Sequence, residues 1–148
     1  MMKQLKSFLG TVNEVEKLKD QSSNLLNQPI ANGKWSTKEI IAHMYYWDYF
    51  ILHQMVPNMV DGAKLTAFPD HNKHNEEGLE LVGDQSIESI IKLFIETREK
   101  LVRELDALEE DIRFTIGAGK RQFSIESFVK IFVRHDAHHL KQIHELVE

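Results

Sequence analysis

Apolar side chains recur every three or four residues in four stretches of the chain, with polar side chains between them. This spacing places the apolar residues on one face of an α-helix. The stretches cover residues 3–21, 36–55, 86–108 and 124–148. The pattern therefore predicts an all-α protein built from four amphipathic helices.

The second of these helices has the clearest start signal. Ser36 and Glu39 are spaced as in a capping box. In that motif the serine hydroxyl accepts a hydrogen bond from a free backbone N–H, and the glutamate accepts one from the cap residue. Pro57 is expected to end the helix, because proline has no N–H to continue the helical hydrogen bonds.

The segments between the helices differ in length. Residues 57–84 contain two prolines and three glycines and are predicted to be irregular, and a loop this long is usually functional or disordered. In the shorter connector, residues 112–116 alternate apolar and polar and are followed by residues 117–119, Gly-Ala-Gly. This pattern suggests a small β-hairpin.

Four helices with one long connection between the second and third fit a four-helix bundle. The length of 148 residues predicts one domain over residues 1–148, large enough to bury a core without disulfides or structural metals. The pattern leaves open whether the helices run up-down-down-up or in simple up-down order.

Composition and charge narrow the functional classes. The chain has no cysteine, which excludes disulfides, thiolate catalysis and cysteine-based zinc sites. Its net charge is −5, with basic residues scattered among acidic ones, so we expect no nucleic-acid partner. No apolar run approaches the ~20 residues that span a bilayer, and residues 1–9 lack the apolar core of a signal peptide. These features predict a cytoplasmic protein with no membrane partner.

The candidate chemistry lies among the eight histidines. His135 and His139 fall in the middle of the apolar seam of the fourth helix, four residues apart. At this spacing two imidazoles lie one above the other and can bind the same ion. His43 lies in the apolar stripe of the second helix, one turn before Trp47. A facing helix can bring it to the same point, so the three histidines are the predicted metal ligands.

A buried histidine is more often a core residue that is hydrogen-bonded locally, and this is the commoner role for His43 taken alone. Burying His135 and His139 without a shared partner would cost the desolvation of both rings, whereas a divalent ion satisfies both. Three histidines with open coordination positions are typical of a catalytic rather than a structural centre. His138 lies toward the edge of the seam and is the weaker ligand candidate.

Several other polar residues have two interpretations each. Asp48 could support a ligand or act as a base, although a solvated carboxylate is the more ordinary interpretation. Asn72, His74 and Asn75 could rim the mouth of the site or belong to an ordinary polar loop. Gln142 could orient a ligand or simply be a polar residue at the end of the seam.

Two strings of the sequence resemble signatures of the DinB-like, or DinB/YfiT, superfamily. Residues 35–43, Trp-Ser-Thr-Lys-Glu-Ile-Ile-Ala-His, resemble its Trp-Ser-x-x-Glu signature, which ends in a histidine. Residues 135–143 resemble its C-terminal His-x-x-x-His-x-x-Gln-Ile signature, and residues 68–75 resemble the loop before its third helix. The matches follow the expected order and cover nearly the whole chain.

The resemblance implies a bundle with a long crossover, often a homodimer, and a nickel or zinc ion held by residues that correspond to His43, His135 and His139. Some members transfer low-molecular-weight thiols such as bacillithiol, mycothiol or glutathione, or are thiol-dependent isomerases. The first hypothesis is therefore a metal-dependent thiol S-transferase that acts on a small-molecule substrate. The alternatives are a hydrolase that uses metal-bound water and a non-catalytic stress protein that binds metal or a small ligand.

Overall fold

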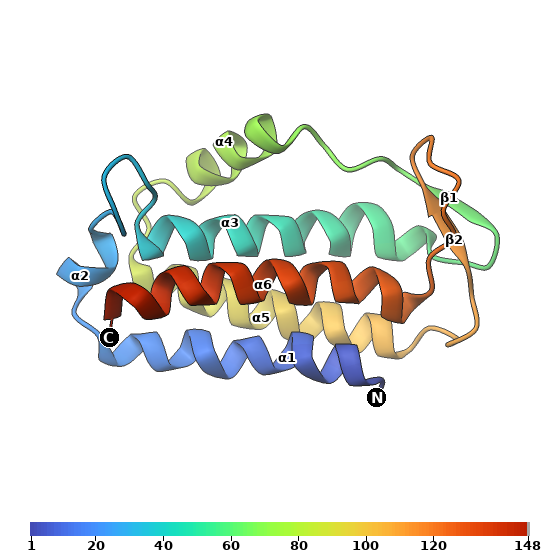
Figure 1. The fold of residues 1–148 in the computed structure, drawn as a ribbon, viewed down its shortest axis with the longest axis horizontal. Coiled ribbons are helices and arrows are strands. Elements are labelled where there is room, and N and C mark those ends of the chain that lie inside the picture. The colour runs from blue at the N-terminus through green and yellow to red at the C-terminus, as the bar shows by residue number, and fades with distance from the viewer. Residues whose placement is uncertain (148) are drawn as a thin grey trace.

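Four long helices form the body of the protein: α1 (Lys3–Glu16), α3 (Thr37–Phe50), α5 (Ile87–Asp106) and α6 (Ile125–Val147). The computed structural model describes residues 1–147. In Figure 1, α3 and α5 run in one direction along the bundle, and α1 and α6 run in the opposite direction. The predicted all-α four-helix bundle is confirmed, and its order is up-down-down-up.

Short helical turns extend two of the predicted helices. A 3₁₀ turn, η1 (Lys17–Asp20), follows α1, and a π-helical turn, η2 (Ile51–Met55), continues α3. A second 3₁₀ turn, η3 (Val56–Asn58), contains Pro57. The first apolar stretch, residues 3–21, thus corresponds closely to α1 with η1. The second, residues 36–55, corresponds closely to α3 with η2. The short helix α2 (Ser23–Asn27) was not predicted.

The start of α3 has the predicted capping box. The backbone N–H of Glu39 donates to the Ser36 hydroxyl at 3.1 Å, and the backbone N–H of Ser36 donates to the Glu39 carboxylate at 3.0 Å. This reciprocal cap satisfies two backbone groups that the first turn of a helix leaves free. It fixes where α3 begins, and therefore where His43 lies along it.

The prediction that residues 57–84 are irregular is wrong. This segment contains a strand, β1 (Ala63–Leu65), and a three-turn helix, α4 (His71–Val82). The Asp70 side chain caps α4, and Gly83 ends it with a φ of 49°, a conformation that favours glycine. In the sequence, Asp70 and Gly83 were the signals that a helix lies between them.

The apolar pattern did not predict helix α4, because two of its three buried positions are not apolar side chains. They are His74, Gly78 and Val82, spaced four residues apart. Gly78 lies so close to α3 that an added Cβ would be 2.9 Å from Cδ2 of Tyr46. The His74 ring stacks on the Tyr46 ring, with centroids 4.3 Å apart. A histidine and a glycine therefore provide much of the packing that holds α4 against α3.

The predicted hairpin is also wrong. Strand β2 (Phe114–Ile116) pairs in parallel with β1 (Ala63–Leu65). The hairpin is reduced to a single antiparallel bridge between Phe114 and Phe123. The partner of β2 thus comes from the segment that was expected to be irregular. The two strands lie together at the end of the bundle opposite the C-terminus (Figure 1).

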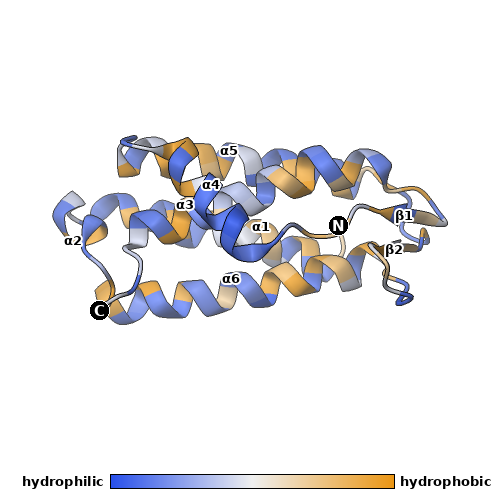
Figure 2. Ribbon diagram, turned by 90° about the horizontal axis from the view of Figure 1, so that it is seen from above, coloured by the Kyte–Doolittle hydropathy of each residue, from blue (hydrophilic) through white to orange (hydrophobic). Residues whose placement is uncertain are grey.

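The apolar core divides into two clusters along the bundle axis. One contains Phe8, Leu101 and Phe128 and reaches the strands, and the other contains Val12, Phe94 and Ile143. Orange bands along α5 and α6 in Figure 2 show the apolar stripes, with hydrophilic faces between them. No helix in the described part of the chain is long and apolar enough to cross a membrane.

Arg98 lies among these apolar side chains and joins all four long helices. Its side chain, 1% exposed, donates to Asp48 Oδ2 and Asp136 Oδ2, each at 2.7 Å, and to the Phe8 carbonyl at 2.8 Å. Thr11 donates to Asp136 at 3.1 Å. Asp48 is only 2% exposed, so its interpretation as a solvated carboxylate is wrong. Removing one partner from such a buried ion cluster leaves a charge without compensation.

Candidate metal centre

Three imidazole rings converge between α3 and α6. The Nε2 atom of His135 lies 3.0 Å from Nε2 of His43 and 3.2 Å from Nε2 of His139. One nitrogen from each ring lies within 4.8 Å of the other two. The structure therefore brings together all three residues that the sequence predicted as ligands, while metal binding itself stays a prediction.

The spacing of these nitrogens fits a shared ion. Two nitrogens that each bind an ion at about 2.0–2.2 Å lie roughly 3.0–3.5 Å apart for common coordination angles. The two Nε2 separations, 3.0 and 3.2 Å, fall in this range. A set of imidazole donors suits zinc and nickel, whereas magnesium and calcium prefer oxygen ligands.

Two side-chain amides fix the orientation of the outer rings. Nδ1 of His43 lies 2.8 Å from Oδ1 of Asn75, and Nδ1 of His139 lies 2.9 Å from Oε1 of Gln142. Because an amide oxygen only accepts, each Nδ1 carries the proton and donates it. The Nε2 lone pairs are then free to bind an ion. Gln142 therefore takes the orienting role that was one of its two interpretations, and Asn75 takes the same role, which the sequence did not suggest for it.

Burial keeps the three rings neutral. Desolvation, followed by the charges of His135 and His139, lowers the pKa of His43 to about 3. Desolvation, followed by the charge of His139, lowers the pKa of His135 to about 4, and desolvation also lowers the pKa of His139. Metals bind the neutral form of imidazole, so these rings are ready to bind an ion at neutral pH.

The low pKa of His43 predicts that the metal-free bundle loses stability in acid. Between its folded pKa of about 3 and its ordinary value of 6.5, the unfolded chain binds a proton that the folded chain does not. The contribution of His43 to the free energy of unfolding is therefore fully present above pH 6.5, and it decreases as the pH falls below 6.5. The measurement is the melting temperature at pH 7 and pH 4.5, for the wild type and for His43→Gln.

We expect the wild type to lose more degrees than His43→Gln between these two pH values. Comparison with the variant is needed because burial raises the pKa of Asp48 to about 6 although Arg98 opposes the shift. A raised carboxyl pKa acts in the opposite sense, stabilising the fold as the pH falls. Equal losses in the two proteins would contradict the assignment of a buried, neutral His43.

Asn75 provides a second prediction. Replacing it with alanine should weaken zinc binding by about 10–100-fold, because ligands lose affinity when their hydrogen-bond partners are removed. Competition with a coloured chelator measures this affinity. Asn72→Ala is the matched control, since Asn72 is an exposed asparagine on the same helix. Unchanged affinity in Asn75→Ala would mean that the amide does not orient His43.

The remaining candidates from the sequence lie outside the cluster. His138 and Asn72 are exposed. His74 is buried between α4 and α3, where its ring contacts Trp47 with centroids 4.4 Å apart. The ring of Trp35 packs near the ring of His43, with centroids 5.0 Å apart. His74 and Trp35 therefore pack around the histidine cluster and are not part of it.

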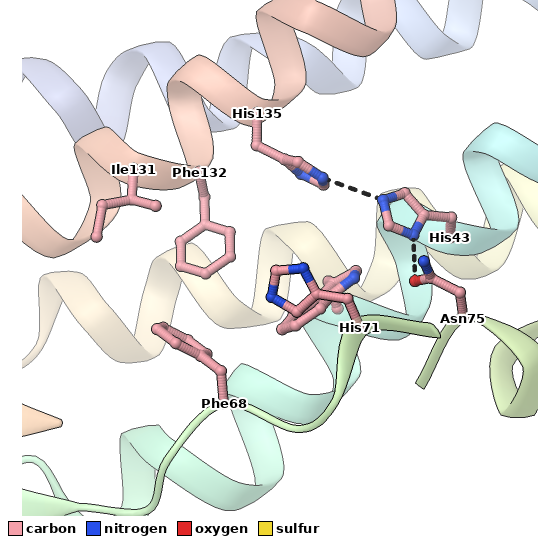
Figure 3. A pocket seen from close by; sticks show the side chains of 8 residues that line it. His43, Phe68, His71, Asn75, Ile131, Phe132 and His135 are labelled. Carbon is pink, nitrogen blue, oxygen red and sulfur yellow. Dashed lines mark hydrogen bonds between the residues drawn. The ribbon is translucent and has the colours of Figure 1, made fainter. Parts of the chain in front are cut away.

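A cavity of about 260 Å³ opens beside the histidines, as Figure 3 shows. His43 and His135 lie at one end of it. The sequence interpretation missed His71, the first residue of α4, which also lines the cavity. The signal for it was its position directly after the Asp70 cap. The residues that line the cavity are His43, Trp47, Phe68, His71, Asn75, Ile131, Phe132 and His135.

Comparison with known proteins supports the fold. A protein-family model described as the DinB superfamily matches residues 11–143. The solved structure of YfiT from Bacillus subtilis, described as a probable metal-dependent hydrolase with an unusual four-helix bundle topology, matches with a TM-score of 0.73. The match covers 97% of this chain and 83% of that chain at 16% sequence identity, which shows a shared fold. No curated protein matches the sequence.

Proposed function

The chain belongs to the DinB superfamily, and we propose that it is a metal-dependent enzyme that activates a small nucleophile at His43, His135 and His139. One observation carries the proposal: three neutral imidazoles converge at the end of a cavity large enough for a small molecule. A zinc or nickel ion held there would supply Lewis acidity, lowering the pKa of a bound thiol or water.

The residues around the cluster suit this task. Asn75 and Gln142 hold two rings in the tautomer that binds metal. His43 and His135 line the cavity, so a molecule inside it can approach an ion that they hold. Trp47 and Phe132 line the same space with apolar surface, which would disfavour water beside a bound substrate. A site used only for metal storage would not need such a cavity.

Within this class we propose a thiol S-transferase. The chain has no cysteine of its own, so a low-molecular-weight thiol would supply the sulfur. The thiol would lose its proton and form a bond from sulfur to an electrophilic carbon, with the displaced group leaving as an anion. An addition to a double bond would instead return a proton to the product. The apolar cavity suits the electrophile, while the histidine cluster suits the thiol.

Hydrolysis is the second candidate, and His71 is the observation that favours it. Its imidazole lines the same cavity as His43 and His135, where it could accept a proton from an attacking water. YfiT, which has the same fold, is described as a probable metal-dependent hydrolase. His71→Gln should slow a hydrolytic reaction while leaving zinc affinity unchanged.

The test measures thiol consumption by zinc-loaded and nickel-loaded protein, with glutathione and bacillithiol against a panel of electrophiles. We expect faster conjugation by loaded wild type than by His135→Ala, which lacks the central ligand. A loaded protein that consumes thiols no faster than this variant would contradict the transferase. Hydrolysis of ester and amide substrates would then be tested with the same pair of proteins.

A further inference from the structure

We infer that the cavity beside the three histidines takes an uncharged aromatic molecule of about two fused rings as the acceptor substrate. The role of this molecule as acceptor rests on the proposed function. The binding of such a molecule rests on the cavity alone, and the two can be tested separately.

Three aromatic rings, those of Trp47, Phe68 and Phe132, line the cavity, and the Trp47 ring also lies beside His43, with centroids 6.5 Å apart. The ring centroid of Phe68 lies 6.0 Å from that of Trp47 and 5.9 Å from that of Phe132, in both cases with the planes inclined at 65°. Such edge-to-face separations are typical of aromatic clusters. A flat ring inserted among them can make the same kinds of contact, with Ile131 supplying further apolar surface.

Charge is missing from the lining of this cavity. Among the described residues that line the cavity there is no lysine, arginine, aspartate or glutamate. The amide oxygen of Asn75 is already engaged by His43. Away from His71 and the other histidines, a phosphate, a carboxylate or the hydroxyls of a sugar would therefore lose water without gaining partners, which costs free energy.

The volume sets the size of the ligand. A cavity of about 150 Å³ lined by apolar side chains holds benzene. By proportion, the cavity of about 260 Å³ holds roughly ten non-hydrogen atoms, which is the size of naphthalene or indole. A drug-sized molecule would extend out of the cavity into solvent.

The arrangement also gives the ligand a direction. Figure 3 shows Phe68, Ile131 and Phe132 at one end of the cavity and His43 and His135 at the other. An aromatic body packed among the apolar side chains therefore points any heteroatom or electrophilic carbon toward the histidines. That end is where the proposed function requires the reacting atom.

The test is calorimetric titration with 1-naphthol, using metal-free protein and protein loaded with one equivalent of zinc. We expect saturable one-to-one binding of naphthol to both forms, and no binding of glucose 6-phosphate to the metal-free form. Ile131→Trp, which fills the cavity, should weaken naphthol binding at least tenfold. Leu140→Trp is the matched control on the same helix, because Leu140 is also half-buried but does not line the cavity.

Phe68→Ala provides a second variant that leaves the helices untouched, since Phe68 lies in the connection before α4 and is half-buried. It should weaken naphthol binding several-fold. Naphthol that does not bind the wild type, or that binds Ile131→Trp as tightly as the wild type, would overturn the inference. Zinc uptake is measured in the same samples. Naphthol binding without zinc uptake would support this inference and contradict the proposed function. Zinc uptake without naphthol binding would contradict this inference and support metal binding in the proposed function.

Discussion

His139→Ala should abolish tight metal binding while leaving a folded bundle. The variant removes one of three converging nitrogens and leaves His43 and His135 only 3.0 Å apart. We expect zinc affinity to fall at least 100-fold, because two imidazoles alone form a weak site. Most of the fold remains, because the two apolar clusters do not depend on this ring.

Thermal unfolding with and without zinc measures the effect. A ligand at about 100 times its Kd stabilises the folded state by about 2.7 kcal/mol, which for a chain of this length raises the melting temperature by roughly 5–10 °C. The wild type should show this rise and His139→Ala should not. His138→Ala, at the exposed neighbouring histidine, should respond like the wild type. A full rise in His139→Ala would show that His139 is not a ligand.

Arg98→Met should cause a large loss of stability. The guanidinium contacts Asp48, Asp136 and the Phe8 carbonyl, and it also lies over the Phe8 ring, 3.6 Å from its centroid. Without it, two buried carboxylates lie close together with no cation between them. Breaking a buried ion pair in this way costs about 3–5 kcal/mol. Denaturant unfolding of the metal-free protein measures the change.

A triple variant separates the loss of the ion cluster from the loss of packing. Replacing a whole buried ion cluster with apolar residues of similar size is often neutral or stabilising. Arg98→Met combined with Asp48→Leu and Asp136→Leu should therefore be much more stable than Arg98→Met alone. An Arg98→Met protein within about 1 kcal/mol of the wild type would show that the cluster contributes little to stability.

The four long helices were predictable because each has a continuous apolar face. The same rule missed α4, whose buried positions are His74, Gly78 and Val82. Gly78 is buried because it lets α4 approach α3 closely. His74 is buried because its ring stacks on the ring of Tyr46. Neither residue type counts as apolar in a periodicity argument. The caps, Asp70 and Gly83, were visible in the sequence, but they mark the ends of a helix only when its middle is recognised.

The histidine cluster followed from the sequence because the spacing of His135 and His139 is a local property of one helix. Asn75 and His71 reach the site on α4, so their roles depended on a helix that the pattern did not reveal. Arg98 could have been recognised, since it lies in the apolar seam four residues after Phe94 and three before Leu101. A lone arginine in such a seam needs buried carboxylates, but nothing local identifies Asp48 and Asp136 as its partners.

X-ray absorption spectroscopy of the protein loaded with one equivalent of zinc tests the central claim most directly. We expect three nitrogen ligands at about 2.0–2.2 Å, with the multiple-scattering pattern of imidazole, and loss of one imidazole from the spectrum of His43→Ala. A zinc environment built only from oxygen ligands, or one that His43→Ala leaves unchanged, would contradict it.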